Sequence, residues 1–388
     1  MQLDFRGSVI KQVEHIIQEA IEAGVSDIHI EPYEKKYRLR YRLDGVLQQV
    51  ADLQFNQKEA IVSRVKIMAD LDIAEKRRPQ DGRIKFRAKE GKEVDLRVSI
   101  LPTQHGEKIV LRILDKSQLQ LRLESLGFDE KILASFRKAI HNPYGMVLVT
   151  GPTGSGKTTS LYAALNELNT DQVNITTIED PIEYNLEGIN QTQVHEEIGL
   201  SFAHVLRSIL RQDPNVIMVG EIRDKQTAEI AIRSALTGHM VFSTLHTNDA
   251  ASAVSRLVDM GVEPFLLASS VRLVMAQRLV RRICENCIEA YAPDPQILRD
   301  IGLEEGQEYK RGGGCELCNH TGYRGRTALI ELLVFDQQIT EKVLQHTDAG
   351  EIKQVAKNGG MTTLREAGKE KVKNSVTTVE EIYRETVL

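Results

Sequence analysis

The chain has 388 residues, a length that suggests two or three domains rather than one core. A hydrophobic fraction of 41% and a charged fraction of 27% are typical of a soluble globular protein, and a net charge of −5 argues against a basic surface for nucleic acid. No apolar run reaches the roughly 18 residues that span a bilayer, and residues 1–7 lack a signal pattern, so we expect a cytoplasmic protein that reaches a membrane only through partners.

The first 115 residues are predicted to form a small mixed α/β domain. An apolar stripe at helical spacing follows Ser8, a plausible N-cap, and ends before Gly24. Alternating residues and an Asp44-Gly45 turn signal indicate strands and a hairpin. In chain order, the expected elements are a helix over 8–23, strands over 27–33 and 37–43, a helix over about 57–71, and strands over about 82–88, 93–100 and 108–114.

From residue 126 onward, short apolar strands alternate with helices, a pattern typical of a parallel sheet with helices on both faces. The strands are expected over 146–150, 173–178, 216–219 and 240–245. The cysteines bracket an irregular insert, and about four short helices finish the chain. The predicted organisation is a domain over 1–115, a linker over 116–125, a parallel-sheet core over 126–283, an insert over 284–325 and a helical part over 326–388.

Residues 151–158 match the phosphate-loop pattern GxxxxGK[ST], between a predicted strand and a predicted helix. Glycines there let backbone N–H groups face phosphates at a helix N-terminus. Lys157 would add positive charge beside the phosphates, and the Thr158 hydroxyl would ligate Mg²⁺. The sequence therefore predicts an ATP site formed by Gly151, Pro152, Thr153, Gly154, Ser155, Gly156, Lys157, Thr158 and Thr159.

Carboxylates follow two of the predicted strands. Glu221 ends an apolar strand in the manner of a Walker B motif next to the phosphate loop, where it would orient Mg²⁺ or the attacking water. Glu179 and Glu183 follow the strand over 173–178, where a carboxylate could polarise water. The alternatives are an acid at the mouth of an ordinary strand–helix loop for Glu221 and a solvated loop for the other two.

His239 and His246 flank the predicted strand over 240–245. A histidine at a strand end is often a structural hydrogen bonder. Their place one strand over from the acids favours a role in the same site.

All four cysteines lie in two CxxC pairs, which can supply four thiolates to a closed, tetrahedral Zn²⁺ site. A redox-active CxxC is the alternative, but neither pair opens a helix of a thioredoxin-like unit. We therefore predict structural zinc at Cys284, Cys287, Cys315 and Cys318.

The chain resembles the secretion ATPase superfamily, and within it the type II secretion and pilus-extension motors. The resemblance covers nearly the whole chain and is carried by the runs SDIHIEP (26–32), QDGRI (80–84), the phosphate loop, IEDPIE (178–183), VGEIRD (219–224) and GHMVFSTLHTND (238–249). It implies a RecA-like P-loop ATPase domain preceded by a small PAS-like N2 domain, with a tetracysteine metal subdomain and C-terminal helices. It also implies a hexameric cytoplasmic motor that hydrolyses ATP to assemble type IV pili or the type II secretion pseudopilus.

The same resemblance implies roles for single residues. The carried-over assignments are Lys157 and Thr158 for phosphate and Mg²⁺, Glu183 for the acid proposed to activate water, Glu221 for the Walker B glutamate, His239 and His246 for a histidine pair near the γ-phosphate, Arg97 and Arg112 for N2-domain arginines that reach a neighbour's nucleotide, and Arg324 and Arg326 for arginines near the nucleotide.

The implied partners are five further copies of the chain and an inner-membrane platform protein, with no direct contact to nucleic acid and a location peripheral to the inner membrane. Family members commonly carry a further N-terminal domain, so we expect a shortened chain or a short homologue. The tetracysteine element is generally absent from pilus-retraction motors and favours extension or secretion. The alternatives are a nucleic-acid-translocating or conjugation-type P-loop ATPase, a retraction motor, and a non-enzymatic scaffold.

Overall fold

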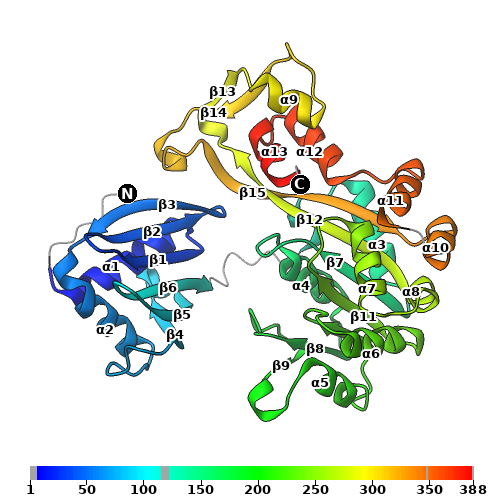
Figure 1. Ribbon diagram of the computed structural model, residues 1–388, viewed down its shortest axis with the longest axis horizontal. Coiled ribbons are helices and arrows are strands. Elements are labelled where there is room, and N and C mark those ends of the chain that lie inside the picture. The colour runs from blue at the N-terminus through cyan, green and yellow to red at the C-terminus, as the bar shows by residue number, and fades with distance from the viewer. Residues whose placement is uncertain (1–6, 115–121, 347, 387–388) are drawn as a thin grey trace. The chain divides into compact units, whose positions relative to one another are not determined.

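The computed structural model describes residues 7–114, 122–346 and 348–386. The chain divides into two compact units, residues 1–119 and 120–388 (Figure 1). Residues 115–121, which include most of the predicted linker, lie outside the described residues, and the short 3₁₀ helix η4 (Leu123–Leu126) follows them. Among the described residues, no helix is both long and apolar enough to cross a membrane.

The first unit is a six-stranded antiparallel sheet whose apolar face packs against two helices, in the order β3-β2-β1-β6-β5-β4. Ser8 caps the first helix, and Asp44 and Gly45 form the predicted turn with positive φ values of 47° and 86°. Strand β3 was not predicted. The elements are α1 (Val9–Glu22), β1 (Asp27–Pro32), β2 (Tyr37–Leu43), β3 (Val46–Leu53), η1 (Phe55–Gln57), α2 (Lys58–Met68), β4 (Gln80–Arg87), η2 (Lys89–Gly91), β5 (Glu93–Thr103) and β6 (Gly106–Leu114).

The other face of this sheet carries charges. In β5, the residues that alternate with Arg97 are buried, as predicted, so Arg97 lies on the charged face. Arg97 is opposite Arg112 on β6, and Arg112 is opposite Asp27 on β1, to which it donates a 2.9 Å hydrogen bond. Both candidate arginines therefore lie in one row across the sheet.

Glu31 on β1 is the buried anion of the same face. Its carboxylate lies 3.0 Å from Arg38, 2.7 Å from Arg40 and 3.1 Å from Lys108. Burial opposes its ionisation, but the hydrogen bonds from these three cations outweigh burial and lower the pKa of Glu31 from 4.5 to about 2.

The second unit is built on a seven-stranded sheet in the order β15-β12-β7-β11-β10-β8-β9. Strands β12, β7, β11, β10, β8 and β9 are parallel, and β15 runs antiparallel at the edge. The elements of this unit from α3 to the end of β12 are α3 (Glu130–Ile140), β7 (Gly145–Thr150), α4 (Lys157–Leu168), β8 (Ile175–Glu179), β9 (Asn190–Gln193), η5 (Glu196–Ile198), α5 (Phe202–Ile209), β10 (Val216–Val219), α6 (Lys225–Leu236), β11 (Met240–Leu245), α7 (Ala250–Asp259), α8 (Pro264–Ser270) and β12 (Val271–Ile283).

The C-terminal part differs from the predicted boundaries. The sequence interpretation ended the parallel-sheet core at 283 and made everything after 325 helical, but β15 crosses that boundary and joins the main sheet beside β12. The predicted four closing helices follow it. The remaining elements are η6 (Glu285–Cys287), β13 (Ile288–Tyr291), α9 (Pro295–Ile301), β14 (Tyr309–Gly312), η7 (Glu316–Cys318), β15 (Tyr323–Val334), α10 (Gln337–Leu344), α11 (Ala349–Asn358), α12 (Leu364–Lys373) and α13 (Val379–Thr386).

The Glu31 cluster makes the stability of the first unit sensitive to acid. Because the folded-state pKa lies below 4.5, its stabilisation is present above pH 4.5 and is lost as the pH falls toward 2. We expect Glu31→Gln to destabilise this unit by about 3 kcal/mol at pH 7 and by progressively less below pH 4.5.

Hydrogen exchange of β1 and β2 in the full chain, compared with wild type at each pH, measures this difference. Glu93→Gln is the matched control, because its ion pair with Arg87 is exposed and should contribute little. The prediction would be contradicted if the stability difference between wild type and Glu31→Gln did not become smaller between pH 4.5 and 2.

Candidate functional site

The phosphate loop connects β7 to α4 through three glycines with positive φ: Gly151 (148°), Gly154 (81°) and Gly156 (88°). A Cβ at Gly151 would lie 2.4 Å from the Gln277 carbonyl oxygen, and one at Gly156 would lie 2.8 Å from the Gln277 side chain. The loop is therefore a backbone cradle at a helix N-terminus, a geometry suited to phosphate groups.

Two buried polar side chains of the loop fit a phosphate ligand. Ser155 Oγ is buried and makes no hydrogen bond within the described part of the chain. Lys157 folds back and donates to the carbonyl oxygens of Gly151 (2.8 Å) and Pro152 (3.0 Å). Burial lowers the pKa of Lys157 to about 8, with Glu221 opposing this effect. An anionic ligand would give both side chains a better partner.

Gln277 on β12 holds the loop in place. It follows Ala276, which pairs with Thr150 at the end of β7, and its side chain accepts a 2.8 Å hydrogen bond from Ser160 on α4. Sequence reasoning missed this residue, because its role depends on two strands that are far apart in the sequence.

Glu221, His246 and Arg223 gather at the carboxyl edge of the sheet. Arg223 donates to Glu221 Oε1 at 2.6 Å and to Asp180 Oδ2 at 3.3 Å, so it bridges the loops that follow β10 and β8. His246 Nε2 lies 3.6 Å from Glu221 Oε2. Burial, with help from Lys157, lowers the pKa of His246, so its ring is neutral at pH 7. Arg223 lies inside the VGEIRD run but had not been given a role.

The strand order corrects the sequence interpretation in one respect. β10, the strand before Glu221, does not adjoin the phosphate-loop strand β7, because β11 lies between them. His246 at the carboxyl end of β11 therefore stands between the loop and Glu221 in the order of the strands. The charge of Glu221 nevertheless opposes the lowering of the pKa of Lys157 in the loop.

His239 precedes β11 and lies at its opposite end. Its ring contacts the Ser234 carbonyl oxygen at 3.0 Å. A six-residue strand is about 20 Å long, so the structure separates His239 from His246 rather than pairing them beside the loop. His239 therefore makes a structural hydrogen bond, which was the alternative to a role in the ATP site.

Glu179 is also placed differently from its predicted catalytic role. The carboxylate is 4% exposed and accepts hydrogen bonds from the hydroxyl of Tyr162 on α4, from Thr177 (2.5 Å) and from Gln191 (2.9 Å). With these donors it ties α4 to β8 and has little capacity left to activate water. Glu183, in the loop beyond β8, is only partly buried.

Arg324 and Arg326 are exposed at the start of β15, where Arg326 is opposite Arg281 on β12. This register places both arginines farther along the antiparallel pair of β12 and β15 than Gln277. They lie beyond the part of β12 that contacts the phosphate loop. The structure therefore leaves their predicted nucleotide contact as a prediction.

The four cysteines form a compact cluster at one end of the small β13–β14 sheet. Their sulfur atoms all lie within 4.8 Å of one another, and three of the separations are 3.7–3.9 Å, much longer than a disulfide bond. Backbone N–H groups of Gly314, Cys315 and Gly322 donate to these sulfur atoms. Four sulfur donors with such backbone support fit a tetrahedral Zn²⁺.

Comparison with known proteins agrees with this geometry. The family described as "Type II/IV secretion system protein" matches residues 2–384. The type IV pilus assembly ATPase PilB of Myxococcus xanthus is 53% identical over 384 residues, covering 97% of this chain and 68% of PilB. The type II secretion system ATPase E of Vibrio cholerae is 51% identical over 382 residues, covering 97% and 75%. The structure of the pilus retraction motor PilT with bound ADP has a TM-score of 0.65 at 26% identity, covering 97% of each chain.

The fold and the glycine cradle define a protein of the P-loop nucleotide-binding class. More specifically, the chain belongs to the type II/IV secretion system protein family. The predicted fold class and the predicted family are thereby confirmed.

The cysteine cluster makes a prediction about metal content. The purified chain should contain about one Zn²⁺, because four thiolates in a closed shell stabilise a small insert with little core of its own. Cys315→Ser should lose the metal and increase hydrogen exchange in residues 284–325, while ATP affinity changes little. Elemental analysis and hydrogen exchange measure the two effects. Metal-free wild type of normal stability would contradict the assignment.

Proposed function

We propose that this chain is a motor ATPase that hydrolyses Mg²⁺-ATP to drive assembly of type IV pili or of the type II secretion pseudopilus. The observation that carries the proposal is the phosphate cradle with Lys157 and Glu221 at one edge of the sheet. The names of two relatives that are more than 50% identical support the choice of these two systems. Retraction has less support, because PilT is only 26% identical.

Each residue at the edge has a chemical task in this proposal. The loop backbone and Lys157 bind and neutralise phosphate oxygens, and Thr158 and Glu221 hold Mg²⁺, which supplies further charge neutralisation when it is bound. Glu183 is the candidate for orienting the attacking water, because Glu179 is occupied by other donors. Neutral His246 lies beside Glu221, where it can accept or donate a hydrogen bond.

Arg223 holds one of the two carboxylate oxygens of Glu221. In the structure its guanidinium occupies one oxygen of Glu221 and also contacts Asp180. We infer that Arg223 positions these two acids, one after β8 and one after β10.

The proposed assembly is a homohexamer that acts with an inner-membrane platform protein, at the cytoplasmic side of that membrane. In this assembly, Arg97 and Arg112 contact the nucleotide of a neighbouring copy. Arg324 and Arg326, at the start of β15, also contact the nucleotide. The support for the arginines is the family resemblance and the shared row of Arg97 and Arg112 on the charged sheet face.

Steady-state ATPase and nucleotide-binding assays test this function. Lys157→Ala should lower turnover by about 10²-fold or more, because charge stabilisation of that kind is lost. Glu221→Gln should bind ATP with near wild-type affinity but turn it over at a similarly low rate. Arg97→Ala should bind ATP normally and hydrolyse it slowly.

Glu229→Gln is a control, since this partly exposed carboxylate on α6 forms a 3.7 Å pair with Lys225 and lies outside the proposed site. Lys157→Ala with more than about a tenth of wild-type turnover would contradict the site. Equal loss of ATP binding in Glu221→Gln would make Glu221 structural, and Arg97→Ala at the wild-type rate would remove Arg97 from the mechanism.

A further inference from the structure

Four consecutive residues directly after His246, the anchored segment 247–250, are each bonded to a side chain from a different element. The N–H of Thr247 donates to the hydroxyl of Thr150, at the end of β7, at 2.9 Å, and the two hydroxyl oxygens lie 2.7 Å apart. The other three residues are held by later parts of the chain: Asn248 by Arg278 on β12, Asp249 by Lys353 on α11, and Ala250 by Glu331 on β15.

Lys353 connects α11 to the start of α7. Its ammonium donates to Asp249 Oδ2 at 2.7 Å, while Asp249 Oδ1 accepts from the Ser252 N–H at 2.8 Å and so caps α7. Burial opposes the charge of Lys353, but the hydrogen bond to Asp249 and the charges of Glu331 and Asp249 outweigh burial and raise the pKa of Lys353. The pair is therefore charged at pH 7, and its side chains are only 34% and 19% exposed.

Glu331 and Arg278 are buried groups that hold the same segment. Glu331 is 1% exposed and accepts a 2.8 Å hydrogen bond from the N–H of Ala250, the first residue of α7. Arg278 is 4% exposed and donates to the Asn248 carbonyl oxygen at 3.0 Å. Because a buried polar group that loses its partner is costly, these contacts restrict the segment to one position.

The backbone on both sides of His246 is fixed by these contacts. Leu245, the residue before it, pairs with Thr150 in the sheet, and its carbonyl oxygen accepts from the Thr150 hydroxyl at 3.1 Å. The His246 side chain itself is half exposed and lies 3.6 Å from Glu221 Oε2. Packing around the ring is therefore incomplete, so the place of the ring depends on the backbone that carries it.

Helix α11 is a firm support for this contact. Ile352, next to Lys353, is buried in the core of the second unit, and α11 packs against α7. The sequence predicted α11 only as one of the closing helices and gave it no part in the ATP site.

We propose that Lys353 is a positioning residue for ATP hydrolysis, which holds Asp249 and through the anchored segment keeps His246 in place beside Glu221. This inference rests on the proposed function. Since the phosphate loop makes the main contacts with the nucleotide in that function, the Lys353–Asp249 pair should affect turnover more than ATP affinity.

Steady-state ATPase and ATP-binding assays with the whole chain test the proposal. Lys353→Met keeps an apolar stem without the charge and should lower kcat about tenfold while ATP affinity changes less than about twofold, because a small misplacement near the reacting atoms has a large effect on rate. Asp249→Asn should have the same effect, since asparagine still caps α7 but cannot form the ion pair. The double variant should be no slower than either single variant. Lys353→Arg keeps the charge and should retain at least about half of wild-type kcat.

The same substitution in a His246→Ala background shows whether the effect depends on this histidine. His246→Ala should itself lower kcat, and adding Lys353→Met should then lower it by less than about twofold further. A purely structural role for Lys353 would lower kcat by the same factor in both backgrounds.

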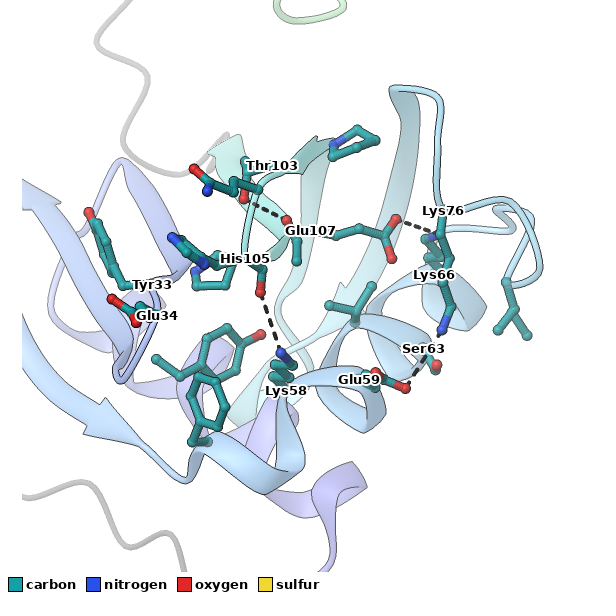
Figure 2. A pocket seen from close by; sticks show the side chains of 18 residues that line it. Tyr33, Glu34, Lys58, Glu59, Ser63, Lys66, Lys76, Thr103, His105 and Glu107 are labelled. Atoms are coloured by element: carbon teal, nitrogen blue, oxygen red, sulfur yellow. Dashed lines mark hydrogen bonds and ion pairs between the residues drawn. The ribbon is translucent and has the colours of Figure 1, made fainter.

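Two control variants remove a lysine charge that does not contact the anchored segment. Lys357→Met, also on α11, loses a 3.5 Å pair with Glu366 in which both side chains are exposed. Lys76→Met loses an exposed 3.6 Å pair with Glu59 at a pocket of the first unit, which Figure 2 shows. Both variants should keep wild-type kcat, because exposed pairs contribute little.

Wild-type kcat in Lys353→Met would overturn the proposal, and so would wild-type kcat in His246→Ala. A fall of the same size in both backgrounds would also overturn it. If Lys353→Met does not fold, Asp249→Asn in the two backgrounds carries the same test. Wild-type chain without ATP turnover would reject the proposed function together with this inference, whereas an active wild type with an equally active Lys353→Met would reject this inference alone.

Discussion

The close approach of the Gly151 backbone to the Gln277 carbonyl is the contact on which the ATP site depends. β7 and β12 run side by side up to the pair Thr150–Ala276, and the phosphate loop turns immediately beyond it. Any side chain at 151 would collide with Gln277 and with Ser155, at 2.4 and 2.6 Å. This fixed turn determines where α4 begins, and therefore where Lys157 and the first N–H groups of the helix lie.

Lys157 and Glu221 at this edge have protein partners in the structure. Lys157 bonds to carbonyl oxygens of its own loop, and Glu221 is held by Arg223. Burial makes the charged form of Lys157 less favourable, so an anion that replaces those carbonyl contacts stabilises the ammonium. Lys157 on α4 and Arg223 after β10 therefore hold the contacts that a bound metal–nucleotide complex would compete for.

The sequence was sufficient for features determined by local pattern and insufficient for those determined by distant strands. The phosphate loop and the helix after Ser8 follow from short-range signals, and the structure has both. The antiparallel pair of β12 and β15 was not predicted. Gln277 and Arg278 interrupt the apolar run of β12, although both residues are buried. The role of Glu179 depends on its contact with Tyr162, which comes from α4. The separation of His239 from His246 depends on the length of β11.

Measuring ATP affinity in two glycine variants tests the central claim, that the Gly151–Gln277 contact shapes the phosphate site. Both positions have positive φ, but a Cβ at Gly154 meets no described atom within 4 Å. Gly151→Ala combines backbone strain with a collision and should weaken ATP binding about 100-fold, whereas Gly154→Ala should cost about tenfold or less. Equal affinities in the two variants, or wild-type affinity in Gly151→Ala, would contradict this account.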